Sequence, residues 1–338
     1  MVQATVVILA WNNLEYLKRF LPTLVDYTPA DEALVMVADN GSSDGSVAWI
    51  KVNFPKVSVL PLDRNHGFTG GYIRALKEVG TPLAVLLNSD IEVKRGWLKP
   101  LLLTMQDPLI GAAMPKILSH ADPAKFEYAG ASGGMIDRYG YPFCRGRVFA
   151  HLEHDHGQYN KPCQVFWASG ACMMVRMDAY HKAGGLDERF FAHMEEIDLC
   201  WRIHRSGYQV WVNPESEVLH VGGGSLPNEH PHKIFYNFRN SLLMLRKNLS
   251  RVDRRGILWM RMILDGVAAF KYLLNGKVTL ALAILKAHAG YYQLRRNYPE
   301  PEHRIKLREI PGYHPFSTVW RYFVRGTKTY DKLVVKGD

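Results

Sequence analysis

Cysteine is scarce in this sequence, and its spacing forms no recognisable framework. The 338 residues contain four cysteines and no C-x-x-C pair, whereas disulfide scaffolds and zinc sites use close, paired spacings. We therefore expect reduced thiols that lie in the core. No basic segment precedes the first apolar run and no small-residue cleavage site follows it, which predicts a cytoplasmic protein. The cysteines are Cys144, Cys163, Cys172 and Cys200.

Two well-known phosphate-binding loops are also absent. No GxGxxG follows the first apolar run, and neither GxxxxGKS nor GxxxxGKT occurs anywhere, which argues against dinucleotide-dependent hydride transfer and P-loop phosphoryl transfer. The sequence has no internal repeat of about 20 to 50 residues, so a solenoid or propeller is not expected. Its composition, 47% hydrophobic and 22% charged, is typical of a globular protein with a sizeable core.

Apolar runs alternate with helical stretches over residues 4–90. Each short run is followed by a polar turn and then by a helical segment, which predicts βαβ units and a mostly parallel sheet with helices on both faces. The expected fold class is therefore α/β. Residues 110–232 are less regular, with a strand expected over 163–176 and a helix over 195–207 that ends at Gly207. The four runs are TVVILA (5–10), ALVMVA (33–38), VSVLPL (57–62) and PLAVLL (82–87).

Positive charge is concentrated in the last third of the chain. Residues 233–338 contain 21 Lys and Arg against 7 Asp and Glu, a net charge of +14, which leaves −4 for residues 1–232. Charges interrupt the apolar segments 256–274 and 278–294, so neither predicts a transmembrane span of about 20 apolar residues. A basic amphipathic region can bind nucleic acid or an anionic membrane, or pack on the rest of the protein. The interrupting residues are Arg261, Asp265, Lys271 and Lys286.

Polar side chains follow the predicted strands directly. Asp39 comes after the second run in ADNGSSDGS, and Asp90 closes LLNSD after the fourth. Between them, the Gly-rich stretch 64–76 opens a helix, where backbone N–H groups can meet an anion. Ligands of open α/β sheets collect at the carboxyl ends of the strands, so Asp39 can accept hydrogen bonds from a ribose or a base and Asp90 can face a ligand. The alternative is that both residues only form turns or caps.

Five motifs in this order resemble those of the family 2 nucleotide-sugar glycosyltransferases, especially the rhamnosyltransferase-like branch. The resemblance covers roughly residues 4–250 and implies a GT-A fold, a Rossmann-like and mostly parallel sheet flanked by helices, here with a basic helical appendage. It divides the chain into a catalytic domain at 1–232, with a nucleotide-binding half at 1–110 and an acceptor-binding half at 111–232, and a C-terminal region at 233–338. The motifs are DNGSSDGS, NHGFTGG, LLNSD, GACMMVR with GGLDERFF and EEIDLCWR, and VLHVGGGS.

The resemblance assigns the donor and a metal to the strand ends. It implies that Asp39 contacts the nucleobase or ribose and that Asp90, the last residue of a DxD-like motif, binds Mg²⁺ or Mn²⁺. His220 of VLHVGG is implied as a second metal ligand, the alternative being a structural histidine beside a glycine turn. Asn88 stands at the first DxD position, a departure that leaves the metal site short of charge. The implied donor-binding residues besides Asp39 are Asn65, Gly67, Gly70, Gly71, Asn88 and Ser89.

The acidic cluster HMEEIDLCWR contains the implied catalytic base. An attacking hydroxyl must lose its proton, which calls for a carboxylate with a raised pKa. In the family the second residue of a Glu-Asp pair is the base; that position is Glu196 here, and Glu195 is the alternative. Asp198 is expected to contact the acceptor or to pair with Arg202 at i+4, and the whole cluster can also be read as an acidic first helical turn. The other expected acceptor contacts are Trp167 and Gly170.

Two further patterns are interpreted as structural. HLEHDH at 151–156 carries metal-binding residue types, but its spacing fits no zinc pattern. An apolar stripe within 256–274 is expected to face the core or another helix. The stripe consists of Trp259, Met260, Met262, Ile263 and Leu264.

These features predict an inverting glycosyltransferase that moves one sugar from a UDP- or dTDP-sugar, with dTDP-rhamnose as one candidate, to a lipid-linked or polysaccharide acceptor of the cell envelope. No QxxRW motif of processive synthases occurs. The alternative is a catalytically silent sugar-nucleotide or glycan-binding module, which would be expected to lack its acidic residues. A nucleic-acid binder is disfavoured because no RRM, KH or helix-turn-helix signature is present. We expect residues 233–338 to hold the enzyme on the inner face of the cytoplasmic membrane, or to form a homo-oligomer.

Overall fold

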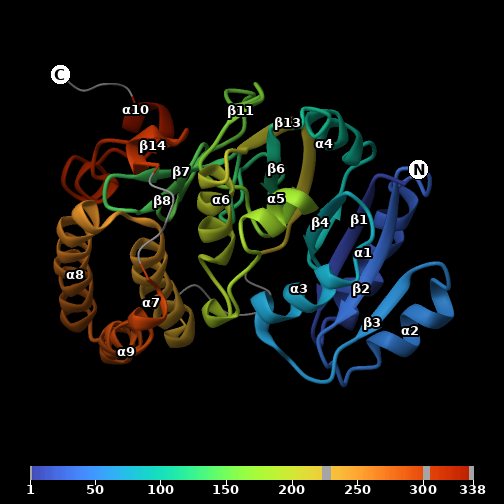
Figure 1. Cartoon of the computed structure of the whole chain (residues 1–338), viewed down its shortest axis with the longest axis horizontal. Helices are drawn as coiled ribbons and strands as arrows, with labels where there is room; N and C mark the ends of the chain where they lie inside the picture. The colour runs from blue at the N-terminus through green and yellow to red at the C-terminus, as the bar shows by residue number, and fades with distance from the viewer. Residues whose placement is uncertain (1, 223–229, 300–304, 335–338) are drawn as a thin grey trace.

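A nine-stranded sheet forms the centre of the computed structural model, which describes residues 2–222, 230–299 and 305–334. Helices lie on both faces of this sheet, and a helical C-terminal region stands beside it (Figure 1). The predicted α/β class, with flanking helices and a helical appendage, is confirmed. The strands are β1 (Ala4–Ala10), β2 (Ala33–Asp39), β3 (Ser58–Pro61), β4 (Leu83–Asn88), β5 (Ile91–Val93), β6 (Ile110–Ser119), β11 (Cys163–Gln164), β12 (Cys172–Arg176) and β13 (Gln209–His220).

The N-terminal strands pair in parallel, as the alternating apolar runs predicted. The order across the sheet is β11-β13-β6-β12-β4-β1-β2-β3, with β5 paired to β13. β1 lies between β2 and β4, and β2 pairs with β3, all in parallel. β1 and β4 are buried almost throughout. This burial on both faces explains why consecutive residues of these strands are apolar, instead of every second residue. The helices that follow the first three strands are α1 (Leu14–Asp26), α2 (Ser46–Asn53) and α3 (Gly67–Lys77).

The other half of the sheet mixes strand directions. β12 runs antiparallel to both β4 and β6, whereas β13 runs parallel to β6. The single strand predicted over 163–176 is wrong, because the chain forms β11, leaves the ladder and returns as β12. Between the two strands, the N–H groups of Phe166 and Trp167 donate to the carbonyl of Gly134. Only glycine allows this close crossing, since a Cβ at position 134 would lie 2.1 Å from the indole of Trp167.

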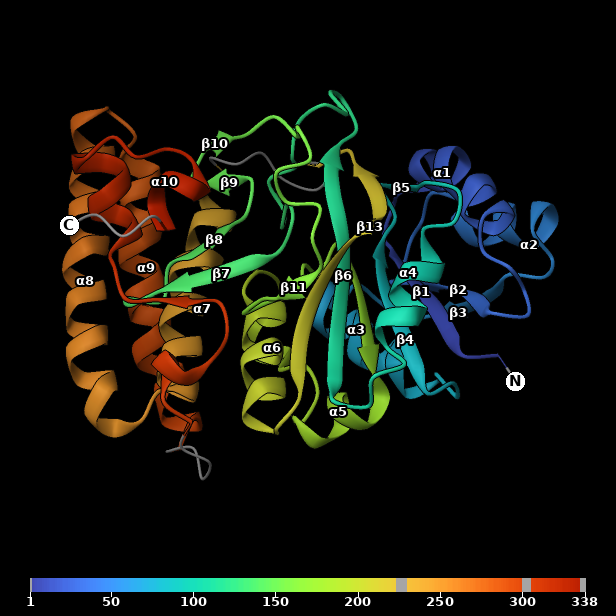
Figure 2. The ribbon, with the colours of Figure 1, turned by 90° about the horizontal axis from the view of Figure 1, so that it is seen from above.

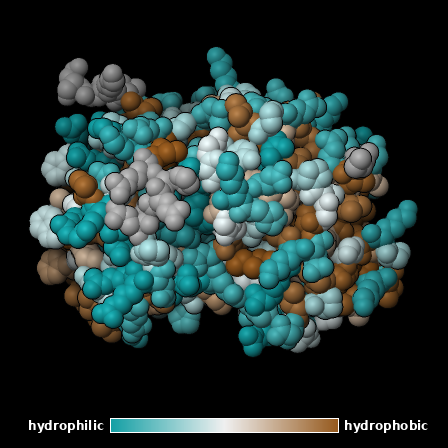
Figure 3. Space-filling model, in the orientation of Figure 1, coloured by the Kyte–Doolittle hydropathy of each residue, from teal (hydrophilic) through white to brown (hydrophobic). Residues whose placement is uncertain are grey.

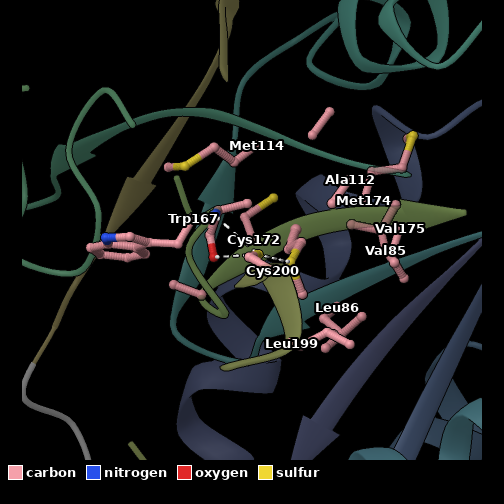
Figure 4. Close-up of a cluster of buried hydrophobic side chains, with 14 of the residues drawn as sticks. Val85, Leu86, Ala112, Met114, Trp167, Cys172, Met174, Val175, Leu199 and Cys200 are labelled. Atoms are coloured by element: carbon pink, nitrogen blue, oxygen red, sulfur yellow. Dashed lines mark hydrogen bonds between the residues drawn. The ribbon is translucent and has the colours of Figure 1, made fainter. Parts of the chain in front are cut away.

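Helix α6 (Glu195–Arg205) packs against the centre of the sheet. The helix predicted over 195–207 is confirmed to within two residues, and Gly207 follows it with a φ of +88°, a left-handed conformation typical after helix ends. Leu199 and Cys200 of α6 belong to the same buried cluster as Leu86 of β4 and Cys172 of β12 (Figure 4). The two other helices near this part of the sheet are α4 (Leu98–Thr104) and α5 (Met177–Lys182).

The cysteines are free, and all except Cys163 are buried. Burial raises the pKa of the Cys172 thiol far above its usual range and that of Cys200 to about 12. A thiol that stays protonated is neither a nucleophile nor a metal ligand. The prediction of reduced core cysteines is therefore confirmed for these buried residues, whereas Cys163 is half-buried beside Arg145.

A small five-stranded sheet lies between the main sheet and the C-terminal helices (Figure 2). Its order is β10-β9-β8-β7-β14, and its last strand comes from the C-terminal region: Tyr313 pairs with Ile136 in parallel. The appendage is thus joined to the catalytic part by main-chain hydrogen bonds. The strands are β7 (Gly134–Asp137), β8 (Pro142–Cys144), β9 (Arg147–Val148), β10 (His151–Leu152) and β14 (Tyr313–His314).

Three long helices form most of the C-terminal region, with α8 outermost (Figure 2). α7 buries the side chains of 242–245 in the main core, and it also shares a smaller apolar cluster with α8 and α9. The domain boundary predicted between 232 and 233 falls in the first turn of α7 and stays a prediction. The helices are α7 (Pro231–Asn248), α8 (Arg251–Leu274), α9 (Val278–Leu294) and the short α10 (Tyr330–Val334).

Helix α8 turns charged side chains inward. Arg261 is 3% exposed and lies over the ring of Tyr141, with its guanidinium 3.8 Å from the ring centroid. Asp265, one turn later, is fully buried, and its carboxylate lies 3.1 Å from Nε2 of His288 on α9. A buried charge is tolerated where such partners surround it. These contacts therefore fix which face of α8 points at the protein.

The opposite face of α8 carries two residues of the apolar stripe, and the other three are half-buried. Trp259 and Ile263 are 64% and 41% exposed, so the expectation that the stripe faces the core or another helix is wrong for these two residues. The physical reason is that the partners of Arg261 and Asp265 lie on the protein side, and a helix cannot bury both faces against one surface. Within the described ranges, no helix is long and apolar enough to cross a membrane.

Candidate active site

The carboxyl ends of β1, β2 and β4 meet at one edge of the sheet. In the parallel register Ala10 of β1 lies opposite Asp39 of β2, and Leu9 lies opposite Asn88 of β4. The loop after β1 contacts the turn after β4, because the side chain of Asn13 donates to Oγ of Ser89 at 2.8 Å. Two of the predicted donor-binding strand ends are thus brought together on either side of β1.

Asp39 holds a buried carboxylate oxygen toward this edge. The residue is 4% exposed, and Oδ2 accepts a hydrogen bond from the N–H of Ser42 at 3.1 Å. Its other oxygen, Oδ1, is buried and has no hydrogen-bond partner among the described residues. An orphaned buried carboxylate oxygen is costly unless a ligand supplies a donor. This geometry fits the hydrogen bond to a base or ribose that the sequence suggested for Asp39.

The glycine-rich loop before α3 is held by two amides. Asn40 accepts from the N–H of His66 at 3.0 Å, and its amide donates to Asn65 and to the carbonyl of Gly67. Asn65 in turn accepts from the N–H of Gly67 at 2.8 Å. Gly67 has a φ of +71°, and Gly71 packs so closely on Leu9 that a Cβ there would lie 2.6 Å from it. Asn65 and the glycines therefore shape this loop; Gly70 lies beside Glu188.

Asp90 lies in the turn between β4 and β5, where it meets His220. β5 pairs antiparallel with β13, so the end of β13 returns to the LLNSD turn, and His220 lies opposite Ile91. Nε2 of His220 is 3.2 Å from Oδ1 of Asp90. The structure therefore brings the two predicted metal ligands into contact. The side chain of Asp90 contacts His220 and does not cap a helix, which was the alternative.

A second carboxylate, Glu127, contacts the other nitrogen of His220. Oε2 of Glu127 lies 3.0 Å from Nδ1 and also accepts from the N–H of Ala129. Burial alone would lower the pKa of His220, but the carboxylates of Asp90 and Glu127 outweigh it and raise that pKa to about 10. Gly222 is required beside them, because a Cβ would lie 2.6 Å from Oε1 of Glu127. Sequence reasoning missed Glu127, which belongs to no short motif.

Asp90 and His220 offer an oxygen and a nitrogen donor of the kinds that Mg²⁺ and Mn²⁺ accept. Because the pair is 3.2 Å apart and the pKa of His220 is raised, binding of a cation would have to displace the proton of the imidazole. A histidine that ligates a metal commonly presents its other ring nitrogen to a carboxylate, which is the position of Glu127. Across the described ranges, no cluster of three or more His, Cys, Asp or Glu side chains could by itself hold a metal, so phosphate and water oxygens would have to complete the shell.

The polar side chains of the HLEHDH segment form structural contacts. The rings of His154 and His156 stack on each other, with centroids 5.9 Å apart. Asp155 between them forms an ion pair with the buried Lys116 at 2.7 Å, and Lys116 also pairs with Glu217. These contacts connect the segment to β6 and β13.

Two carboxylates at the start of α6 lack compensation. Glu195 is 5% exposed and Glu196 is partly exposed, and Oε2 of each is buried without a hydrogen-bond partner in the described part of the chain. Burial raises the pKa of Glu196 to about 7. Burial and the charges of Glu196 and Asp198 raise the pKa of Glu195 well above its usual range. Perturbed carboxylates in this state are suited to proton transfer near neutral pH.

Asp198, on the same helix, is fully compensated. Its Oδ2 accepts from Arg202 at 2.7 Å and from Lys247 at 2.9 Å, and Oδ1 accepts from Asn248 at 2.7 Å. Burial opposes ionisation, but the two cations outweigh it and lower the pKa of Asp198 to about 2. The alternative pairing with Arg202 is confirmed. As a contact to an acceptor Asp198 stays a prediction, and both of its oxygens are already engaged in joining α6 to α7.

The other two expected acceptor contacts lie in the loop between β11 and β12. Trp167 is 3% exposed and its Nε1 donates to the carbonyl of Met135 at 3.0 Å, so this indole is packed inside. Gly170 is different, because a Cβ on it would lie 3.5 Å from that of Glu196. The next residue, Ala171, accepts from the N–H of Asn88 at 2.9 Å. This loop places Glu196 close to the turn that carries Asp90.

Comparisons with known proteins identify the family of the chain. A model of the family "Glycosyl transferase family 2" matches residues 5–184. The chain is 26% identical to an N-acetylglucosaminyl-diphospho-decaprenol L-rhamnosyltransferase of Mycobacterium tuberculosis, over 91% of this chain and 98% of that protein. It is 24% identical to the dTDP-rhamnosyl transferase RfbF of Shigella flexneri, over 68% of this chain and 76% of that protein.

Solved structures show the same fold. GalNAc-T7 with UDP, GalNAc and Mn²⁺ superposes with a TM-score of 0.59 at 14% identity, covering 90% of this chain and 59% of that one. TarS residues 1–349 of S. aureus in complex with UDP-GlcNAc gives a TM-score of 0.58 at 13% identity, covering 88% and 82%. The family model spans more than half of the chain, which therefore belongs to glycosyl transferase family 2 and is a glycosyltransferase of the GT-A fold.

Proposed function

We propose that the enzyme transfers one sugar from a nucleoside diphosphate donor, with dTDP-rhamnose as the first candidate, to a hydroxyl of a lipid-linked acceptor, with inversion at the anomeric carbon. The observation that supports the proposal is the Asp90–His220 pair, which follows β4 at the sheet edge where β2 ends with the orphaned oxygen of Asp39. Glu196, with its raised pKa, packs near Gly170, in the loop whose Ala171 bonds to Asn88. The names of the M. tuberculosis and S. flexneri relatives support the choice of sugar and acceptor.

The donor side of the site is built from rigid groups. Asp39 accepts from the base or ribose, and the loop at Asn65 and Gly67 approaches the diphosphate. Asp90 and His220 would hold a divalent cation, with Glu127 fixing the orientation of the imidazole. When bound, such an ion neutralises the charge that develops on the diphosphate leaving group.

Glu196 acts as the general base. It removes the proton from the acceptor hydroxyl while the acceptor oxygen bonds to the anomeric carbon and the bond from that carbon to the phosphate oxygen breaks. One displacement of this kind inverts the configuration, and the leaving nucleoside diphosphate takes the bonding electron pair. The desolvated surroundings of Glu196 make its carboxylate a stronger base than one in water.

A panel of nucleotide sugars tests the function, and Asp90→Ala tests the metal assignment. With a decaprenyl-diphosphate-linked sugar as acceptor, we expect the wild type to release dTDP or UDP from one donor in Mg²⁺ or Mn²⁺ and to lose this activity in EDTA.

Asp90→Ala should lower turnover by about 10²-fold or more, because one carboxylate of a two-residue set is removed. Asp122→Ala, an exposed aspartate paired with Lys125, is the matched control. Full turnover with unchanged metal dependence in Asp90→Ala would show that the assignment is wrong.

The base is tested by two isosteric substitutions and a pH profile. Glu196→Gln should lower kcat by about 10²-fold with little change in donor affinity, because the amide has the same size and no basicity. In the wild type, kcat/KM should rise with pH through about 7, since the carboxylate must be deprotonated to accept the proton. If Glu195→Gln shows the large loss and Glu196→Gln is nearly silent, the base is Glu195.

We further propose that the outer face of α8 and α9 binds an anionic membrane, where a lipid-linked acceptor is found. On α8, Val267, Lys271 and Leu274 lie one turn apart on the same face. On α9, Leu282 and Lys286 repeat the pattern. Figure 3 shows apolar side chains along the lower left edge, where Figure 1 places these helices. The most exposed apolar residues here are Val252, Trp259, Val267, Phe270, Leu274 and Leu285.

The charge and the apolar area act together in this proposal. Basic residues near an anionic surface contribute about 1 kcal/mol each, and exposed apolar side chains that enter the interface add about 25 cal/mol per Å². The inward orientation of Arg261 and Asp265 leaves Trp259 and Ile263 of the stripe exposed, whereas Met262 contacts Tyr292 of α9. A second copy of the chain is the competing occupant of this face, and the vesicle experiment below distinguishes the two.

Cosedimentation with vesicles tests this face. Binding should increase with the fraction of anionic lipid and weaken as salt screens the charges. Leu274→Ser, at a position 72% exposed, should reduce binding several-fold, whereas Leu103→Ser on α4, 51% exposed, should not. Equal binding to neutral and anionic vesicles at low salt would reject the electrostatic anchor. A dimer that Leu274→Ser dissociates, without any vesicle binding by the wild type, would assign the face to a second copy.

A further inference from the structure

The turn that leads into α6 is strained. Phe191, His193 and Met194 have φ values of +64°, +71° and +71°, a region that residues with side chains rarely adopt. Three such residues within four positions, directly before Glu195 and Glu196, require contacts that hold them in place. Without those contacts the turn would be expected to relax and to move the start of α6.

Two neighbouring side chains of α7 hold this turn. Nη2 of Arg239 donates to the carbonyls of Arg189 and Phe190, and the amide of Asn240 reaches further along the turn. Asn240 is fully buried, and its Nδ2 donates to the carbonyls of Phe190 at 2.9 Å, Ala192 at 2.8 Å and His193 at 2.8 Å. Its own Oδ1 accepts from Nε of Arg239 at 2.9 Å. The side chain is therefore fixed at both ends and points its donor at three successive parts of the strained turn.

The same turn contacts residues 64–71, the proposed donor loop, which includes the first turn of α3. The carbonyl of Phe191 accepts from the N–H of Thr69 in α3 at 3.0 Å. The ring of Phe191 lies where a Cβ on Gly67 would stand, 2.6 Å away, and it stacks on Tyr236 of α7 with centroids 5.3 Å apart. On the other side, the carbonyl of Met194 accepts from the N–H of Asp198 in α6. The turn thus joins the donor loop, the helix that carries the base and α7.

We propose that Asn240 is a positioning residue, which holds the turn at 190–194 so that Glu196 faces the acceptor hydroxyl while the donor loop keeps its shape. The proposal rests on the proposed function of Glu196 as the base. Asn240 does not touch the reacting atoms; it acts through the main chain of the turn. This gives the C-terminal region a role in catalysis in addition to any role at a membrane.

Asn240→Ala and a matched control test the proposal. Asn237, three residues earlier on α7, donates to the carbonyl of Lys233 within the same helix and to no other described residue, so Asn237→Ala controls for loss of an amide from α7. With the donor found in the panel, Asn240→Ala should lower kcat by about 10- to 100-fold and keep the donor KM within about 3-fold of the wild-type value. The control Asn237→Ala should have a kcat near that of the wild type. Equal kcat values for the two variants would overturn the proposal.

Glycine at position 194 gives a rescue experiment. Glycine adopts a φ of +71° without a steric penalty, so Met194→Gly should recover part of the lost kcat in the Asn240→Ala background. Asn240→Ser, which keeps one hydroxyl donor, should fall between wild type and alanine and serves if the alanine variant does not fold. If kcat falls only in proportion to the fraction of folded protein, and Met194→Gly does not restore it, the role of Asn240 is structural alone.

Hydrogen exchange separates this inference from the proposed function. In the free enzyme, Asn240→Ala should speed exchange several-fold in the peptide 188–199 and leave the peptide 83–93 unchanged, whereas Asn237→Ala should change neither. Absence of turnover by the wild type with every donor would reject the proposed function. The exchange experiment would still decide whether Asn240 holds the turn, and unchanged exchange in 188–199 would reject that as well.

Discussion

The site depends on the position of β1 between two parallel partners. Because β1 pairs with β2 on one side and β4 on the other, in a register that places Ala10 opposite Asp39 and Leu9 opposite Asn88, the loops that follow these strands must leave the sheet at one edge. A slip of one residue would turn every side chain of a strand to the other face. The buried apolar residues of β1 and β4 prevent this slip, so the same interactions that form the core also fix the distance between the donor-binding groups.

The buried carboxylates of α6 are of two kinds: one has cationic partners, and the other two have none. Asp198 is surrounded by Arg202, Lys247 and Asn248, which stabilise its charged form. Glu195 and Glu196 lie on the same helix without such partners, so burial raises the pKa of both. One helix can carry both classes because positions 196 and 198 point in directions about 200° apart. The compensated carboxylate anchors the helix, and the uncompensated pair has the raised pKa values that the proposed base requires.

The sequence predicted the parallel strands, the helix at 195–205 and the residues at the strand ends, because each depends on a local pattern of apolar runs and turns. It did not predict Glu127 or Asn240. Each acts through contacts with segments far away in the chain, His220 for one and the turn at 190–194 for the other, and no periodicity records such a contact. The division of 163–176 into two strands has the same cause, since the crossing at Gly134 is a tertiary interaction.

The orientation of α8 shows how buried polar pairs can override an apolar pattern. Hydropathy alone places Trp259 and Ile263 inside, yet Arg261 and Asp265 occupy the inner face because Tyr141 and His288 compensate them there. Leaving either charge buried without its partner would cost about 3–5 kcal/mol, more than the burial of one apolar side chain returns. A similar balance holds at the turn before α6, where three left-handed residues cost about 1–3 kcal/mol each and the hydrogen bonds of Asn240 return about 1 kcal/mol each. Those bonds alone do not offset the strain, so the packing of Phe191 against Gly67 and Tyr236 must contribute the rest. The C-terminal helices are therefore part of what keeps the turn at 190–194 in place.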